Sequence, residues 1–141
     1  MSRRIGAGLS VAVLAIALLG GAVTPADREL VDAAKRGDVA AVRSLLGEGA
    51  DPDEAQGDGL TALHVVAQEG NLEITQLLLD AEANVAAATR LGAYTALHLA
   101  SGGAHASVVR ALLEAGAAAD AVTSSSGVTP LHLAAKALNG E

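Results

Sequence analysis

The sequence predicts a mostly α-helical solenoid, in which similar helical units stack along one axis. The tetrapeptide Thr-Ala-Leu-His at residues 61–64 returns at 95–98 and, with Pro in second place, at 129–132, each time 34 residues further on. A fixed period of this length is the signature of stacked supersecondary units. Pairs of leucines recur with nearly the same period, at 45–46, 78–79 and 112–113, which are spaced 33 and 34 residues apart.

The composition agrees with this fold class and limits the possible partners. Phe and Trp are absent and Tyr94 is the single tyrosine, which suits closely stacked helices packed with Ala, Val and Leu. From Asp27 onward the chain carries seven Lys/Arg and sixteen Asp/Glu, a net charge of −9. This acidity disfavours nucleic acid, whose affinity for proteins comes largely from Lys and Arg that neutralise phosphates. It favours a basic or neutral partner, mainly through the rate of encounter.

Residues 1–26 differ from the rest of the chain and predict a secretory signal peptide. Arg3 and Arg4 precede an uncharged stretch at 5–19, which is shorter than the roughly 20 apolar residues of a membrane-spanning helix. Cleavage after Ala22 or, preferably, Ala26 fits the small residues there; an uncleaved membrane anchor is the alternative. We therefore expect residues 27–141 to be periplasmic or secreted, with no membrane attachment after cleavage.

Residues 61–70 predict the first helix of a unit. Thr61 is a suitable N-cap, because its hydroxyl can accept a hydrogen bond from a free backbone N–H of the first turn. The next position favours proline, and Pro130 meets that preference in the last unit. The helix is expected at 62–69, with a turn at Gly70.

The second helix of the same unit is expected at 72–81, with its aliphatic residues on one face. Its end calls for a left-handed backbone conformation, which Gly49 and Gly116 can adopt in the neighbouring units. Glu82 stands at the corresponding position, at an expected cost of roughly 1 kcal/mol relative to glycine. We expect this unit to be locally weaker.

Together these features resemble the ankyrin repeat, with its Thr-Pro-Leu-His opening, a glycine between the helices and a Leu-Leu-x-x-Gly-Ala close. The resemblance covers residues 27–141 and implies helix-turn-helix units joined by β-hairpin-like finger loops, at 53–60, 85–94 and 121–128. The turn geometry is least certain at Gly92 and Ala93, because the turn glycine stands one place early. The units are expected as an N-terminal capping unit at about 27–56, repeats at about 57–90 and 91–124, and a truncated repeat at about 125–141.

The two ends of the stack differ. The first helix of the capping unit is rich in charged residues, as a polar end of a solenoid requires. At the other end the chain stops at Glu141, before any second helix. Either the last half-unit is frayed or, as we prefer, the sequence is a fragment of a longer array.

The repeated histidines do not form a metal site. Units in such a stack lie roughly 10 Å apart, whereas zinc requires ligand nitrogens at about 2 Å, so three equivalent histidines cannot share an ion. The resemblance implies instead a structural hydrogen bond that joins adjacent units, with the threonine hydroxyl alongside; His105 is expected to be structural as well. The motif residues are Thr61, His64, Thr95, His98, Thr129 and His132.

No pattern indicates catalysis or a cofactor. Residues 51–54, Asp-Pro-Asp-Glu, begin like a calcium loop, but Ala55 and Ala62 stand where a ligand and the bidentate Glu are needed. Nucleophile elbows, phosphate-binding glycine loops and zinc spacings are also absent from the sequence. We therefore expect a protein that is not an enzyme and that binds no cofactor or metal.

The function expected from the resemblance is a monomeric scaffold that binds a protein partner through its finger loops and the exposed face of the first helices. Tyr94 is the expected hot spot, because tyrosine is enriched among energetically dominant interface residues; the alternative is a tyrosine packed on its own loop. Two other functions stay open: an N-terminal targeting module of a larger secreted enzyme, and a structural spacer. Carried over by position, the partner-binding residues are Asp58, Leu60, Gln68, Glu69, Leu91, Tyr94, Ser126, Val128 and Lys136.

Overall fold

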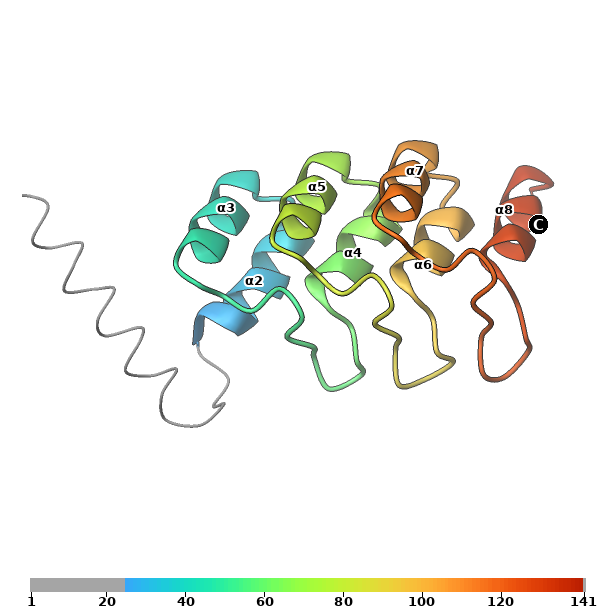
Figure 1. Ribbon diagram of the computed structural model, residues 1–141, viewed down its shortest axis with the longest axis horizontal. Coiled ribbons are helices and arrows are strands. Elements are labelled where there is room, and N and C mark those ends of the chain that lie inside the picture. The colour runs from blue at the N-terminus through green and yellow to red at the C-terminus, as the bar shows by residue number, and fades with distance from the viewer. Residues whose placement is uncertain (1–24, 141) are drawn as a thin grey trace, which may run out of the picture.

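Seven helices in two rows make up the part of the chain that the computed structural model describes, residues 25–140 (Figure 1). The first helices of the units pack on one another in the order α2, α4, α6, α8, and the second helices in the order α3, α5, α7. This arrangement confirms the predicted helical solenoid. The bounds are α2 Pro25–Arg36, α3 Val39–Gly47, α4 Ala62–Glu69, α5 Leu72–Asp80, α6 Ala96–Gly102, α7 Ala106–Glu114 and α8 Pro130–Leu138.

The helix bounds follow the sequence-based expectation closely. Helix α4 spans the predicted residues, and α5 ends one residue earlier than predicted. Helix α2 begins at Pro25, two residues before the expected start of the array. The expected signal-peptide features at residues 1–24 lie outside the described part of the chain.

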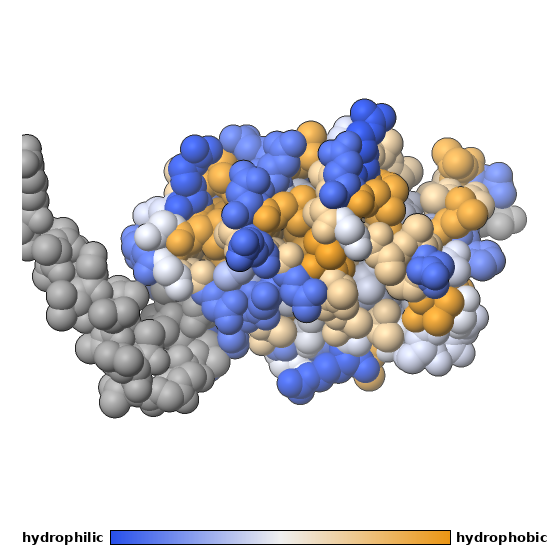
Figure 2. Space-filling view, in the orientation of Figure 1, coloured by the Kyte–Doolittle hydropathy of each residue, from blue (hydrophilic) through white to orange (hydrophobic). Residues whose placement is uncertain are grey.

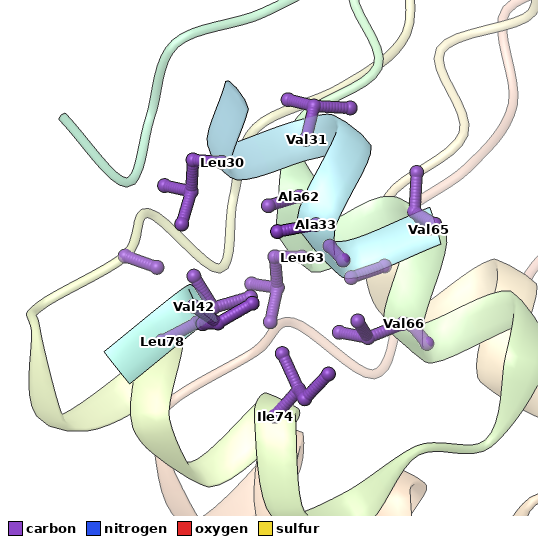
Figure 3. Close-up of a cluster of buried hydrophobic side chains, with 14 of the residues drawn as sticks. Leu30, Val31, Ala33, Val42, Ala62, Leu63, Val65, Val66, Ile74 and Leu78 are labelled. Atoms are coloured by element: carbon purple, nitrogen blue, oxygen red, sulfur yellow. The ribbon is translucent and has the colours of Figure 1, made fainter. Parts of the chain in front are cut away.

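The core is a continuous strip of aliphatic side chains between the two rows. Figure 3 shows Leu63 of α4 among side chains from α2, α3 and α5, the last represented by Ile74 and Leu78. These three residues are almost completely buried. Alanines of α2, α4 and α6 are also buried, and their small size allows neighbouring first helices to approach closely. The stack thus forms a core without any Phe or Trp.

Each Thr-x-Leu-His motif begins a first helix with a capping box. In α4 the Thr61 hydroxyl accepts a bond from the His64 N–H, and the His64 ring accepts one from the Thr61 N–H. The same reciprocal pair begins α6 and α8. Two of the free donors at each helix start are thereby satisfied.

Positive φ values mark the ends of several helices. Glu82 has φ 62°, so it does adopt the left-handed conformation that the sequence assigned to this place. In the third unit, Ala104 takes φ 57° after α6, where Gly37 and Gly70 serve after α2 and α4. Ala104 was not singled out from the sequence, although it stands 34 residues after Gly70, at the same place in the repeat.

The connecting loops are hairpin-shaped, yet within residues 25–140 no regular strand forms. One isolated antiparallel bridge joins Ala88 to Thr95. At the tip of that loop Gly92 and Ala93 have φ 87° and 54°. This turn, whose geometry the sequence left least certain, is therefore a tight turn with two consecutive residues in the left-handed conformation.

Candidate partner-binding surface

The three finger loops are each closed at the base by backbone hydrogen bonds. In the second and third loops a threonine hydroxyl adds a further bond, because the Tyr94 N–H donates to Thr89 Oγ1 and the Val128 N–H to Thr123 Oγ1. Each loop therefore holds its shape locally. The closing backbone bonds run from Gln56 N to Leu60 O (2.9 Å), Thr89 N to Tyr94 O (2.9 Å) and Thr123 N to Val128 O (3.0 Å).

Neighbouring loops are also bonded to each other. The Arg90 N–H donates to the Asp58 carbonyl at 2.9 Å, and the Ser124 N–H donates to the Gly92 carbonyl at 2.9 Å. These two bonds join the second loop to the first and the third loop to the second. The loops thus form one hydrogen-bonded row along an edge of the stack, seen at the bottom of Figure 1.

The buried histidines fix this row to the helices. His64 Nδ1 accepts the Thr61 N–H at 3.2 Å, so the ring proton lies on Nε2, which donates to the Tyr94 carbonyl at 3.0 Å. Tyr94 belongs to the next loop along the stack, so this bond ties two units together. His98 repeats the arrangement, with Nε2 at 3.1 Å from the Val128 carbonyl.

Burial keeps the first of these rings neutral. Desolvation lowers the pKa of His64, and it outweighs the opposing effects of the carbonyl of Tyr94, a second backbone bond at Ala87 and the charge of Asp58. A charged ring would need to donate from Nδ1, which already faces the Thr61 N–H. The capping bond from the Thr61 N–H therefore depends on the neutral form, whereas Nε2 can donate to the Tyr94 carbonyl in either form.

His132 repeats the capping bonds of the motif but differs in its surroundings. Its Nδ1 accepts the Thr129 N–H at 3.1 Å, as in the other units. Its side chain is exposed, whereas His64 and His98 are buried. The local role of the histidine thus recurs in all three copies, while its burial depends on a following unit.

His105 makes a different connection between units. Its Nε2 lies 2.9 Å from the Gln68 carbonyl at the end of α4. The ring occupies the space beside Gly70 and Gly103, where an added Cβ would come within 2.4 and 2.5 Å of its atoms. The absence of side chains at these glycines makes room for the ring.

The structure divides the residues expected to contact a partner into two groups. Six are exposed: Asp58, Gln68, Glu69, Leu91, Ser126 and Lys136. Three are half-buried: Leu60, Tyr94 and Val128. The half-buried residues occupy the same position of each loop, directly before the motif threonine, and their carbonyls accept hydrogen bonds within the stack.

Tyr94 lies against its own unit. Its ring meets that of His98 edge to face, with centroids 5.9 Å apart, and it covers Gly92, where an added Cβ would lie 2.5 Å from Tyr94 Cε2. This placement corresponds to the alternative considered from the sequence, a tyrosine packed on its own loop. The large apolar side chain that projects from the second loop is Leu91, which is 82 % exposed.

Two residues of the row were not singled out from the sequence. Val122 is an aliphatic residue that is 56 % exposed. It belongs to the third loop, which follows the loop of Leu91 along the row. Arg90 supplies the inter-loop hydrogen bond to Asp58 and has an exposed side chain. The exposed side chain of Arg90 could have been inferred from its position beside Leu91 in the loop, whereas its backbone hydrogen bond leaves no signal in the sequence.

Neither a metal site nor a membrane span is found in the described part of the chain. Across residues 25–140, no three His, Cys, Asp or Glu side chains are grouped so that they could hold a metal ion. None of the seven helices is both long enough and apolar enough to cross a bilayer.

A family model described as ankyrin repeats (3 copies) matches residues 30–123 and also 84–141. The chain is an ankyrin repeat protein. Among curated proteins, this ankyrin chain is 43 % identical over 61 residues to the mouse (Mus musculus) protein "Uveal autoantigen with coiled-coil domains and ankyrin repeats". The match covers 43 % of the ankyrin chain but only 4 % of the mouse protein. Ankyrin repeats are generally protein–protein interaction modules, and their family is typically non-enzymatic.

Proposed function

We propose that this ankyrin array is a non-catalytic scaffold of the cell envelope or the secreted fraction, which binds a protein partner through its finger loops and the exposed face of its first helices. The observation that carries the proposal is the row of loops held together by the Arg90–Asp58 and Ser124–Gly92 backbone bonds. A surface arranged before binding loses little conformational entropy when a partner docks. The apolar N-terminal stretch at 5–19 supports the envelope or secreted location.

The chemistry of the surface indicates the kind of partner. Leu91 offers an exposed aliphatic side chain, while Asp58 and Glu69 beside the row offer carboxylates. A partner with an apolar depression ringed by basic residues would complement both. The overall net charge of −7 would speed the encounter with such a partner.

The experiment is affinity capture from an extract of the source cell's envelope, with the full chain as bait. Leu91→Ser should reduce capture of the specific partner by at least tenfold, because exposed apolar anchors dominate interface energies. Leu138→Ser is the matched control, since Leu138 is equally exposed at 82 % but lies away from the loops. Equal capture by both variants would reject the loop row as the binding surface.

The complete coding sequence would distinguish two other functions from the scaffold. An N-terminal targeting module of a larger secreted enzyme would be followed in the complete coding sequence by a non-repeat domain with catalytic motifs. A structural spacer would be followed by many more units with small residues at the loop tips. A short array that captures a specific partner supports the scaffold instead.

A further inference from the structure

The second finger loop carries an aromatic ring at a position where the other two loops carry an aliphatic side chain. Tyr94 stands directly before the motif threonine, where the first loop has Leu60 and the third has Val128. Tyr94 and Val128 make the same backbone bonds, since each donates to a threonine hydroxyl of its own loop and accepts from a buried histidine. The backbone bonds at this position therefore form with either side chain, and the ring of Tyr94 makes additional contacts.

The ring of Tyr94 contacts both the turn of its own loop and a buried side chain of α6. It covers Gly92, where an added Cβ would lie 2.5 Å from Cε2 and 2.8 Å from Cδ2 of the ring. It also meets the ring of His98 edge to face, with an interplanar angle of 77°. Aromatic pairs in this arrangement attract each other beyond the burial of their area. The ring thus connects the turn at Gly92 and Ala93 to the helical part of the stack.

This turn carries two features of the proposed binding surface. Leu91, which is 82 % exposed, comes directly before Gly92. The Gly92 carbonyl accepts the Ser124 N–H, the bond that joins the second loop to the third. Figure 2, in the same orientation as Figure 1, shows both hydrophilic and hydrophobic residues along this loop edge. A backbone fixed at Gly92 therefore sets both the direction of the Leu91 side chain and the position of the carbonyl to which Ser124 donates.

We propose that Tyr94 is a positioning residue of the binding surface, whose ring fixes the turn at Gly92 and thereby holds Leu91 in the direction that the partner meets. The inference rests on the proposed function, in which Leu91 is the apolar contact. Ala93 takes φ 54°, which is unfavourable for a residue with a Cβ. Without the ring the turn can relax, and its ordering then costs conformational entropy when a partner docks. Tyr94 contributes to affinity through Leu91, without contacting the partner.

Amide hydrogen exchange of the full chain, measured by NMR, tests the positioning role without a partner. Tyr94→Ala should speed exchange of the Ser124 amide by roughly tenfold or more, because the turn that accepts its hydrogen bond is released. The Arg90 amide, bonded to Asp58, is the internal reference and should change by less than about threefold. Tyr94→Phe retains the ring and should behave as the wild type. Leu60→Ala is the matched control, since it shortens the equivalent side chain of the first loop and should leave the Ser124 amide unchanged.

Affinity capture of the partner that the wild type retains from the envelope extract tests the consequence for binding. Tyr94→Ala should reduce capture by roughly fivefold or more, whereas Tyr94→Phe should not. Because Tyr94 acts through Leu91, the double variant Tyr94→Ala, Leu91→Ser should capture as much as Leu91→Ser alone. A further loss in the double variant would place Tyr94 in direct contact with the partner and overturn the proposal.

Other results would also overturn the positioning role. An unchanged Ser124 amide in Tyr94→Ala would show that the ring does not hold the turn. Equal acceleration at Arg90 and Ser124 would assign Tyr94 a general structural role. Unaltered capture by Tyr94→Ala, despite faster exchange at Ser124, would separate the turn from binding. If the wild type captures no partner, the proposed function fails, and exchange at Ser124 still decides whether the ring of Tyr94 holds the loop.

Discussion

Glu82 illustrates how one residue can disagree with its position in a repeat. It ends the second helix of its unit at φ 62°, where Gly49 and Gly116 have φ 95° and 93° in neighbouring units. A side chain with a Cβ is strained in this conformation, whereas glycine is not. The repeat pattern was sufficient to predict the strained position, because a helix followed by a reversal requires a left-handed residue there.

Replacing Glu82 by glycine should therefore stabilise the array by about 1 kcal/mol. Chemical denaturation of both proteins measures this change in the free energy of unfolding, provided that its dependence on denaturant concentration is the same for both. Glu48→Gly is the matched control, because it removes the same charge at a helix end where φ is already −82°. Equal changes in stability for both variants, or a loss of stability in Glu82→Gly, would show that Glu82 is not strained.

At the scale of elements, the histidines connect each first helix to the loop of the next unit. His64 both caps α4 and donates to the Tyr94 carbonyl, so one side chain stabilises a helix start and an inter-unit contact. Elements and their bounds were largely predictable, since α4 begins at the capping threonine and ends before Gly70. The hydrogen bonds between loops were not predictable, because backbone atoms of Arg90 and Asp58 carry no sequence signal.

The burial of the His64 ring predicts a specific pH dependence of stability. Burial lowers the pKa of His64 in the folded state, so the unfolded chain binds this proton more readily. The stability that the neutral ring contributes is complete above the unfolded pKa of about 6.5 and declines as the pH falls below it. The stability advantage of the wild type over His64→Gln should thus shrink between pH 7.5 and 5.5.

Denaturation of both proteins at the two pH values provides this measurement. Other titrating groups are common to both and cancel in the difference. His132→Gln is the control, because His132 has the same capping bonds but an exposed ring. An advantage that stays constant, or that grows toward low pH, would show that His64 does not titrate as its burial requires.

At the scale of the whole molecule, the linked loops convert a stack of similar units into one extended surface. The period of the Thr-x-Leu-His motif predicted the stack, but it could not show which side chains project from it. Of the two side chains expected at the contact surface on the second loop, Tyr94 lies against His98, whereas Leu91 projects. This difference arises because Gly92, which lacks a side chain, leaves room for the tyrosine ring over its own loop.

The hydrogen bonds between loops should hold the finger loops in one row before any partner binds. Amide hydrogen exchange, followed residue by residue by NMR in the isolated chain, tests it at the Arg90 and Ser124 amides, which donate the two inter-loop bonds. Both amides should exchange at least roughly tenfold more slowly than expected for an unstructured chain, because exchange requires the loops to separate. Exchange at the unstructured rate at both sites would contradict a preformed surface.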